Sequence, residues 1–139
     1  MLEKTRSFTW CGPLRASVVL PVGGDMADAE VTLSWRWIAE KNPHASGAYR
    51  QNPIVKPGLV HIYFNDKEIP QESLTITEMP GGRIPSGFKL KKHQRVEFTV
   101  PGSDLRNGEN TLAFEMPKFP QERDPYVYIY DVTADLRFR

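Results

Sequence analysis

The chain has almost no cysteine, no long apolar run and no excess of charge of either sign. Cys11 is the only cysteine among 139 residues, which excludes an intrachain disulfide and a zinc site built on cysteines. No apolar run approaches the length that spans a membrane, so no membrane partner is expected. The formal net charge is +1 and no nucleic-acid-binding motif is present, so DNA and RNA are not expected partners either.

Stretches free of proline and glycine are also scarce. The 12 prolines and 10 glycines are spread over the whole length, and a proline inside a helix costs about 3 kcal/mol. Apolar residues instead alternate with polar ones, which is the period of a β-strand. Val31, Leu33, Trp35 and Trp37 show it most clearly, and we expect both tryptophans to lie in the core. The sequence therefore predicts an all-β protein.

Eight segments show this alternation, and they predict an eight-stranded antiparallel β-sandwich. They are residues 8–10, 17–22, 31–37, 60–64, 74–76, 96–100, 112–116 and 126–138. In the last segment the apolar residues change phase, from Val127 and Ile129 to Val132 and Leu136. A β-bulge near Tyr130 would keep both sets facing the core, and we expect one there.

The connections between these segments fall into two classes. Residues 39–58, 78–94 and 117–125 are long or irregular, whereas residues 23–30, 65–73 and 101–109 are compact. Alternate connections of an antiparallel sandwich gather at the same end. The long connections are therefore expected to lie together, where loops on a rigid scaffold usually carry binding residues.

Three stretches of the chain resemble a known group of domains. They are residues 60–69 (VHIYFNDKEI), 100–112 (VPGSDLRNGENTL) and 128–132 (YIYDV). This pattern is similar to the galactose-binding-domain-like jelly rolls found beside the catalytic domains of glycosidases and polysaccharide lyases. The resemblance implies a jelly-roll sandwich that either binds sugars or only stabilises the enzyme to which it is attached.

The second stretch is the most specific, and its residues have structural explanations. Leu105 is expected to close the end of the sandwich, and Gly108 to supply a turn position with positive φ. Asn110 is expected to hydrogen-bond neighbouring backbone where the chain enters its strand. These roles build the fold and bind no ligand.

The long connections contain the residue types that sugar binding requires. Aromatic rings stack on the apolar face of a pyranose, and planar polar groups bind its hydroxyls. The candidate binding residues are Tyr49, Arg50, Gln51, Phe119, Arg123 and Tyr126. The alternative is that Tyr49 and Phe119 only pin their loops to the edge of the sandwich.

Two further features of the chain leave alternatives open. Five basic residues between Arg83 and Arg95 would attract an acidic polysaccharide, or they form a solvated edge that protects against aggregation. Tyr126, Tyr128 and Tyr130 share one face of the last segment. With a bulge they would point away from the core, as a ligand platform or as a contact for a neighbouring domain.

Catalytic and metal-binding signals are weak. His44, His61 and His93 stand in no catalytic motif, with His61 expected to point outward from a strand and the other two expected in loops. No cofactor is required. The resemblance implies a structural calcium, and Glu3 and Asp131 stand at the matching places.

The sequence thus predicts a carbohydrate-binding module that is not an enzyme. Residues 1–139 are expected to form one β-sandwich domain of a longer, secreted or periplasmic protein. The module would hold a catalytic domain of the parent protein near its polysaccharide or oligosaccharide. The alternative is a structural accessory domain that packs on its catalytic partner and binds no glycan.

Overall fold

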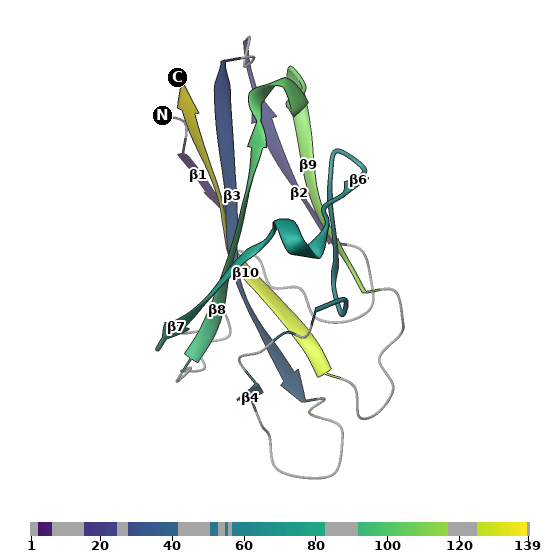
Figure 1. Cartoon of the computed structure of the whole chain (residues 1–139), viewed down its shortest axis with the longest axis vertical. Helices are drawn as coiled ribbons and strands as arrows, with labels where there is room; N and C mark the ends of the chain where they lie inside the picture. The colour runs from purple at the N-terminus through teal and green to yellow at the C-terminus, as the bar shows by residue number, and fades with distance from the viewer. Residues whose placement is uncertain are drawn as a thin grey trace.

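A computed structural model of the protein describes residues 3–6, 16–24, 28–41, 51–52, 55, 57–82, 92–116 and 125–138. At residues 3–6, 16–18, 20–22, 40–41, 51–52 and 125–126 it describes only the course of the backbone. These parts of the chain form two antiparallel β-sheets that pack as a sandwich (Figure 1), and they contain no α-helix. The predicted all-β sandwich is confirmed.

The larger sheet has six strands and the smaller has four. The larger runs in the order β1 (Glu3–Arg6), β10 (Pro125–Phe138), β3 (Ala29–Lys41), β8 (Lys92–Pro101) and β7 (Thr75–Pro80), and β4 (Gln51–Asn52) also pairs with β3. The smaller runs in the order β2 (Ala16–Val22), β9 (Gly108–Glu115), β5 (His61–Phe64) and β6 (Lys67–Glu68). Two short 3₁₀ turns, η1 (Gln71–Ser73) and η2 (Gly102–Asp104), lie in the connections.

The strands differ from the sequence prediction in number and at the N-terminus. The two sheets together have more strands than the predicted eight, because β4 and β6, with two residues each, are too short to show alternation. The predicted strand at residues 8–10 lies outside the described residues. The structure has β1 before that segment, at residues that include no apolar side chain. Antiparallel pairing with β10 defines β1 as a strand.

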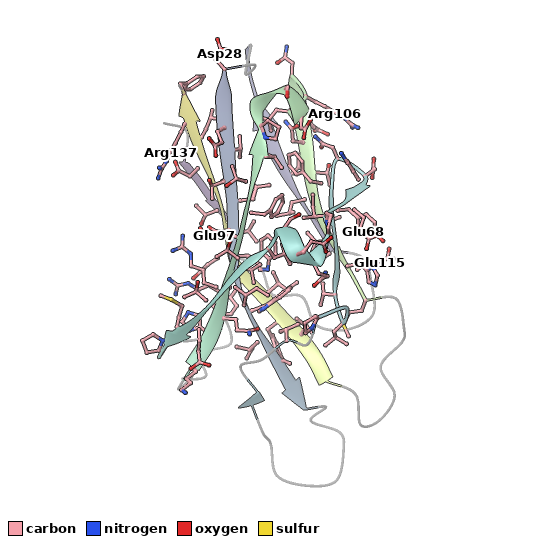
Figure 2. The ribbon with its side chains drawn as sticks, viewed as in Figure 1. Asp28, Glu68, Glu97, Arg106, Glu115 and Arg137 are labelled. Atoms are coloured by element: carbon pink, nitrogen blue, oxygen red, sulfur yellow. The ribbon has the colours of Figure 1, made fainter. Side chains whose placement is uncertain are left out.

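The core lies between the sheets and is centred on aromatic rings. Trp35 and Trp37 are buried, as predicted, with 0% and 2% of their surface exposed. The Trp35 ring meets the rings of Trp37, Phe98 and Phe114 edge to face, at centroid distances of 5.9, 5.8 and 5.0 Å. This geometry is favourable for aromatic pairs. Figure 2 shows the apolar side chains that fill the space between the sheets.

The expected β-bulge is present in β10. The register between β10 and β3 shifts between Tyr130 and Thr133, and Asp131 has a φ of 52°. Val127 and Ile129 before the shift and Val132 and Leu136 after it all belong to the same core cluster. The bulge therefore resolves the change of phase as the sequence predicted.

The strand ends that border the long connections lie at one end of the larger sheet. Lys41, the last residue of β3, pairs with Pro125 at the start of β10. Pro80 at the end of β7 pairs with Lys92 at the start of β8, and β8 begins where β3 ends because the two are antiparallel. The end of β2 and the β8–β9 connection lie at the opposite end of the sandwich, whereas the connection after β5 returns to η1 near its middle (Figure 1). The expected grouping of the long connections is confirmed for the strand ends of β3, β7, β8 and β10.

Candidate functional site

The outer face of the larger sheet is polar over the half that lies beyond the bulge. Val31, Leu33 and Trp35 of β3 point into the core, so Thr32 and Ser34 between them lie on the face turned away from it. The strands on either side of β3 contribute polar residues to the same face. These are Arg95, Glu97 and Thr99 from β8, and Thr133, Asp135 and Arg137 from β10.

Register arranges these residues in rows across the sheet. Ser34 pairs with Thr133 on one side and with Glu97 on the other, and Glu97 pairs in turn with Thr75. The next row joins Asp135, Thr32 and Thr99. Paired residues of neighbouring strands have their Cβ atoms within about 5.5 Å of each other, so each row is continuous.

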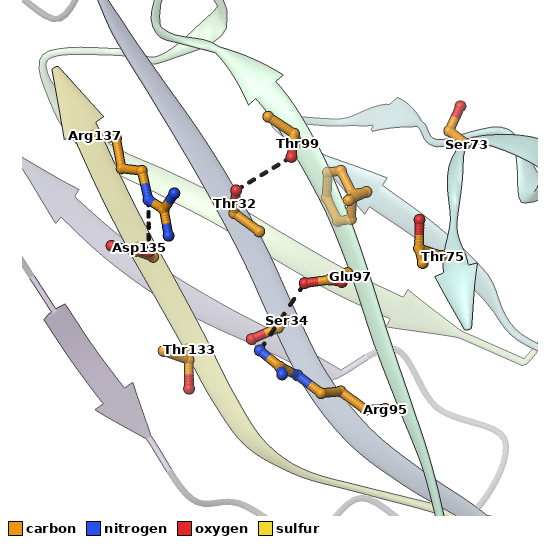
Figure 3. A pocket seen from close by; sticks show the side chains of 11 residues that line it. Thr32, Ser34, Ser73, Thr75, Arg95, Glu97, Thr99, Thr133, Asp135 and Arg137 are labelled. Carbon is orange, nitrogen blue, oxygen red and sulfur yellow. Dashed lines mark hydrogen bonds and ion pairs between the residues drawn. The ribbon is translucent and has the colours of Figure 1, made fainter. Parts of the chain in front are cut away.

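Together the rows line a shallow concavity of about 670 Å³, seen from close by in Figure 3. Arg95 and Arg137 stand at its margins, and the hydroxyl groups of Ser73 and Thr75 border it on the side of β7. This volume is within the range of small-molecule sites, which typically measure about 300–1,000 Å³.

Two guanidinium–carboxylate pairs and a hydroxyl pair hold these side chains. Arg137 Nε donates to Asp135 Oδ2 at 3.2 Å, and Arg95 Nη2 lies 3.9 Å from Glu97 Oε2. The hydroxyl groups of Thr32 and Thr99 hydrogen-bond to each other at 3.2 Å. Asp135 Oδ1 is buried and has no hydrogen-bond partner within the described residues. The face thus presents acceptors and donors on side chains that their neighbours orient.

The other half of the outer face carries a small apolar cluster. Ile38 of β3 and Tyr130 of β10 are buried against each other, and Tyr128 packs beside them. The imidazole of His93 lies next to the Tyr130 ring at a centroid distance of 6.4 Å. His93 was expected in a loop and is instead a buried residue of β8, because this cluster covers it.

Burial raises the pKa of Tyr130 to about 12. The charge of Arg36 opposes the shift and the charge of Asp131 adds to it. The two charged groups form an ion pair across the bulge at 3.7 Å. The Tyr130 hydroxyl therefore lies close enough to both groups to feel their charge, and it has no hydrogen-bond partner among the described residues.

Four of the predicted sugar-binding residues lie outside the described residues: Tyr49, Arg50, Phe119 and Arg123. The backbones of the other two, Gln51 and Tyr126, are described. Glu40 of β3 pairs with Gln51 on one side and with Tyr126 on the other. The fold therefore brings these two positions, which are far apart in the sequence, into one row across neighbouring strands.

The register does not bring the two proposed calcium ligands together. Glu3 pairs with Asp135, four positions beyond Asp131 along β10, and the Asp131 carboxylate contacts Arg36. Within the described part of the chain, no three His, Cys, Asp or Glu side chains gather as metal ligands would. Asp131 stands at the bulge, as predicted.

The tyrosine row and the basic patch are only partly as expected. Tyr128 and Tyr130 do lie outside the main core, but Tyr130 is 2% exposed, so the expectation of an exposed row is wrong at this residue because Ile38 packs against it. Of the five basic residues between positions 83 and 95, the structure describes Lys92 and Arg95. Each has an acidic neighbour, because Lys92 contacts Glu78 at 3.0 Å and Arg95 contacts Glu97.

His61 behaves as the sequence predicted. It points outward from β5 and its Nδ1 hydrogen-bonds to Glu68 at 2.6 Å. The residues of the concavity, in contrast, were missed. The signal was the polar half of each alternating segment, such as Thr32, Ser34 and Arg36 between the apolar residues of β3.

No protein-family model matches the chain, and no curated protein matches it. Among the residues that the structure describes, no helix has the length and apolar character that crossing a bilayer requires.

Proposed function

We propose that this protein is a non-catalytic glycan-binding module that binds its polysaccharide across the outer face of the larger sheet. The observation that carries the proposal is the concavity of about 670 Å³ lined by hydroxyl groups and two guanidinium–carboxylate pairs. The proposed recognition surface is thus a sheet face, and it lies away from the long connections, which border the other end of the larger sheet.

The chemistry of the face matches that of a sugar. Each sugar hydroxyl both donates and accepts, so neighbouring hydroxyls are bound well by a carboxylate and a guanidinium held side by side. Arg95 with Glu97 and Arg137 with Asp135 form two such pairs, with Thr32 and Thr99 between them. Since the pairs stand on rigid strands, binding requires little ordering of side chains.

The topology supports the jelly-roll interpretation. The strands β1-β10-β3-β8 of one sheet face β2-β9-β5 of the other, so the first and last strands pair. These seven strands follow the order of a jelly roll, whereas β7 departs from it because it pairs with β8 at the edge of the larger sheet. The N-terminal strand and the last strand would then frame the proposed ligand surface.

Binding without catalysis fits the shape of this face. Glycoside hydrolysis requires two carboxylates that flank the scissile bond across a cleft. Here Glu97 and Asp135 each lie beside an arginine of their own strand, on a broad and shallow surface. Such a surface binds a polymer along its length, as a module attached to a catalytic domain would.

Affinity electrophoresis against neutral and acidic polysaccharides tests the proposal. We expect at least one polymer to retard the protein, and Glu97→Gln to weaken that retardation by about tenfold, the loss typical of one charge-assisted hydrogen bond. Glu109→Gln is the matched control, because Glu109 is exposed on β9 of the other sheet.

Two results would overturn the proposal. One is that no polymer in a broad panel retards the protein. The other is that Glu97→Gln and Glu109→Gln behave alike while Tyr49→Ala abolishes retardation, which would move the binding site to the long connections.

A further inference from the structure

Two arginines face each other on the outer face, next to the concavity. Arg36 of β3 pairs directly with Arg95 of β8, and Tyr130 of β10 pairs with Arg36 from the other side. Like charges at directly paired positions destabilise a sheet, so a pair of this kind requires a compensating group. Both guanidinium side chains remain accessible, with 40% and 48% of their surface exposed.

The carboxylates near these arginines only partly compensate them. Asp131 Oδ2 lies 3.7 Å from Arg36 Nη1, and Glu97 Oε2 lies 3.9 Å from Arg95 Nη2. Charge-assisted hydrogen bonds measure about 2.7–2.9 Å, so these carboxylates do not occupy the guanidinium donors. The two guanidinium groups therefore keep donors that these carboxylates do not occupy.

A buried hydroxyl lies beside them. The Tyr130 hydroxyl has no hydrogen-bond partner within the described residues and is close enough to Arg36 for that charge to act on its pKa. Because Tyr130 is buried, a ligand on the outer face would contact the two guanidinium groups and not this hydroxyl.

The strained bulge maintains the arrangement. Asp131 has a φ of 52°, which lies in the left-handed region that residues other than glycine rarely adopt. This conformation brings the Asp131 carboxylate to Arg36, which pairs with Tyr130 directly before the bulge. Backbone strain of this kind often occurs at binding sites, where the rest of the fold holds it in place.

Building on the proposed glycan-binding function, we infer that Arg36 and Arg95 bind an anionic group of the glycan, the carboxylate of a uronic acid. A planar carboxylate offers two oxygens to two guanidinium groups, which Arg binds in a forked geometry. The adjacent hydroxyl groups and guanidinium–carboxylate pairs of the concavity bind the sugar ring that carries it. The ligand is thus an acidic polysaccharide.

Nuclear magnetic resonance titration of the isotope-labelled chain tests this site. The probes are methyl glucuronoside, methyl glucoside and sodium acetate, which separate the charged sugar into its ring and its anion. We expect the glucuronoside to shift the Arg36 and Arg95 resonances at a concentration at least about tenfold below that needed for either other probe.

Substitutions assign the effect to the arginine pair. Arg36→Gln and Arg95→Gln should each weaken glucuronoside binding by about tenfold, and added salt should weaken wild-type binding. Arg106→Gln is the matched control, since Arg106 is exposed beyond η2 and lines no part of the outer face. Arg95→Lys keeps the charge without the fork, so it should retain the salt dependence with reduced affinity. Thermal unfolding of each variant verifies that it is folded.

The outcomes separate this inference from the proposed function. Equal affinity for glucuronoside and glucoside would overturn the acidic specificity and leave glycan binding intact. Acetate that binds as tightly as the glucuronoside would show a free-anion site and overturn the inference. Failure of both sugars and of every polymer would overturn the glycan-binding function as well.

Discussion

Replacing Asn110 with alanine should destabilise the fold strongly without touching the proposed binding face. Asn110 is fully buried at the end of the sandwich that holds the compact connections. Its Oδ1 accepts hydrogen bonds from the Arg106 backbone N–H at 2.7 Å and from Asn65 Nδ2 at 2.9 Å. Its Nδ2 donates to the carbonyls of Arg106 and Gly108 at 2.9 and 3.4 Å. One side chain thus joins the start of β9 to the turn after β5.

The magnitude follows from these contacts. Three of the four hydrogen bonds are short, and each contributes about 0.5–1.5 kcal/mol net. Alanine would also leave the Arg106 N–H facing a buried space, which adds the cost of an unsatisfied donor. Because Asn65 and Arg106 lie near the surface, water recovers part of this loss. We therefore expect a decrease of about 2–4 kcal/mol in the free energy of unfolding.

Urea denaturation, followed by the fluorescence of the buried tryptophans, measures this change. Asn107→Ala is the control, because Asn107 is exposed in the same connection and should change the stability by less than about 0.5 kcal/mol. A loss below about 1 kcal/mol for Asn110→Ala would refute the reasoning, since it would mean that the four contacts contribute almost nothing.

Three other changes test the backbone and the outer face. The free energy of unfolding of the wild type should fall between about pH 10 and pH 12, because Tyr130 ionises near pH 10 in the unfolded chain whereas its pKa in the folded chain is about 12. In urea titrations, Tyr130→Phe should remove about 2–3 kcal/mol of that fall. Asp131→Val should cost about 1–2 kcal/mol in chemical denaturation and Asp131→Gly less than about 0.5 kcal/mol, since only glycine accepts the positive φ freely. Gly82→Ala should lower the melting temperature, because φ is 102° and the new Cβ would lie 3.0 Å from His93, whereas Gly23→Ala has open space.

The fold could be predicted where local chemistry determines it. Alternation in β3 placed both tryptophans in the core, and the change of phase in β10 located the bulge. Leu105 packs against the core, Gly108 has a φ of 102° and Asn110 bonds to backbone, each as the sequence indicated. These features depend on contacts between near neighbours or on the pattern of one strand, which a sequence displays directly.

β1 and His93 show what a sequence does not display. β1 has no apolar residue, and only its pairing with β10 makes it a strand. His93 is polar and adjoins basic residues, yet it is buried because Tyr130, which is distant in the sequence, packs beside it. The candidate site depends on pairing in the same way. Ser34, Glu97 and Thr133 form one row only because β3 lies between β8 and β10.

The bulge links the stability of the core to the chemistry of the outer face. Without the bulge, the strand could not bury both Ile129 and Val132, because they are three positions apart and would point to opposite faces of a regular strand. The residues between them are Tyr130, which is buried against Ile38 on the outer side of the sheet, and Asp131, whose carboxylate is exposed. The same irregularity that completes the core therefore places a hydroxyl and a carboxylate beside Arg36. A deletion of Asp131 would let β10 pair regularly with β3 while Ile129 and Val132 still face the core, so core packing should persist while the carboxylate beside Arg36 is lost.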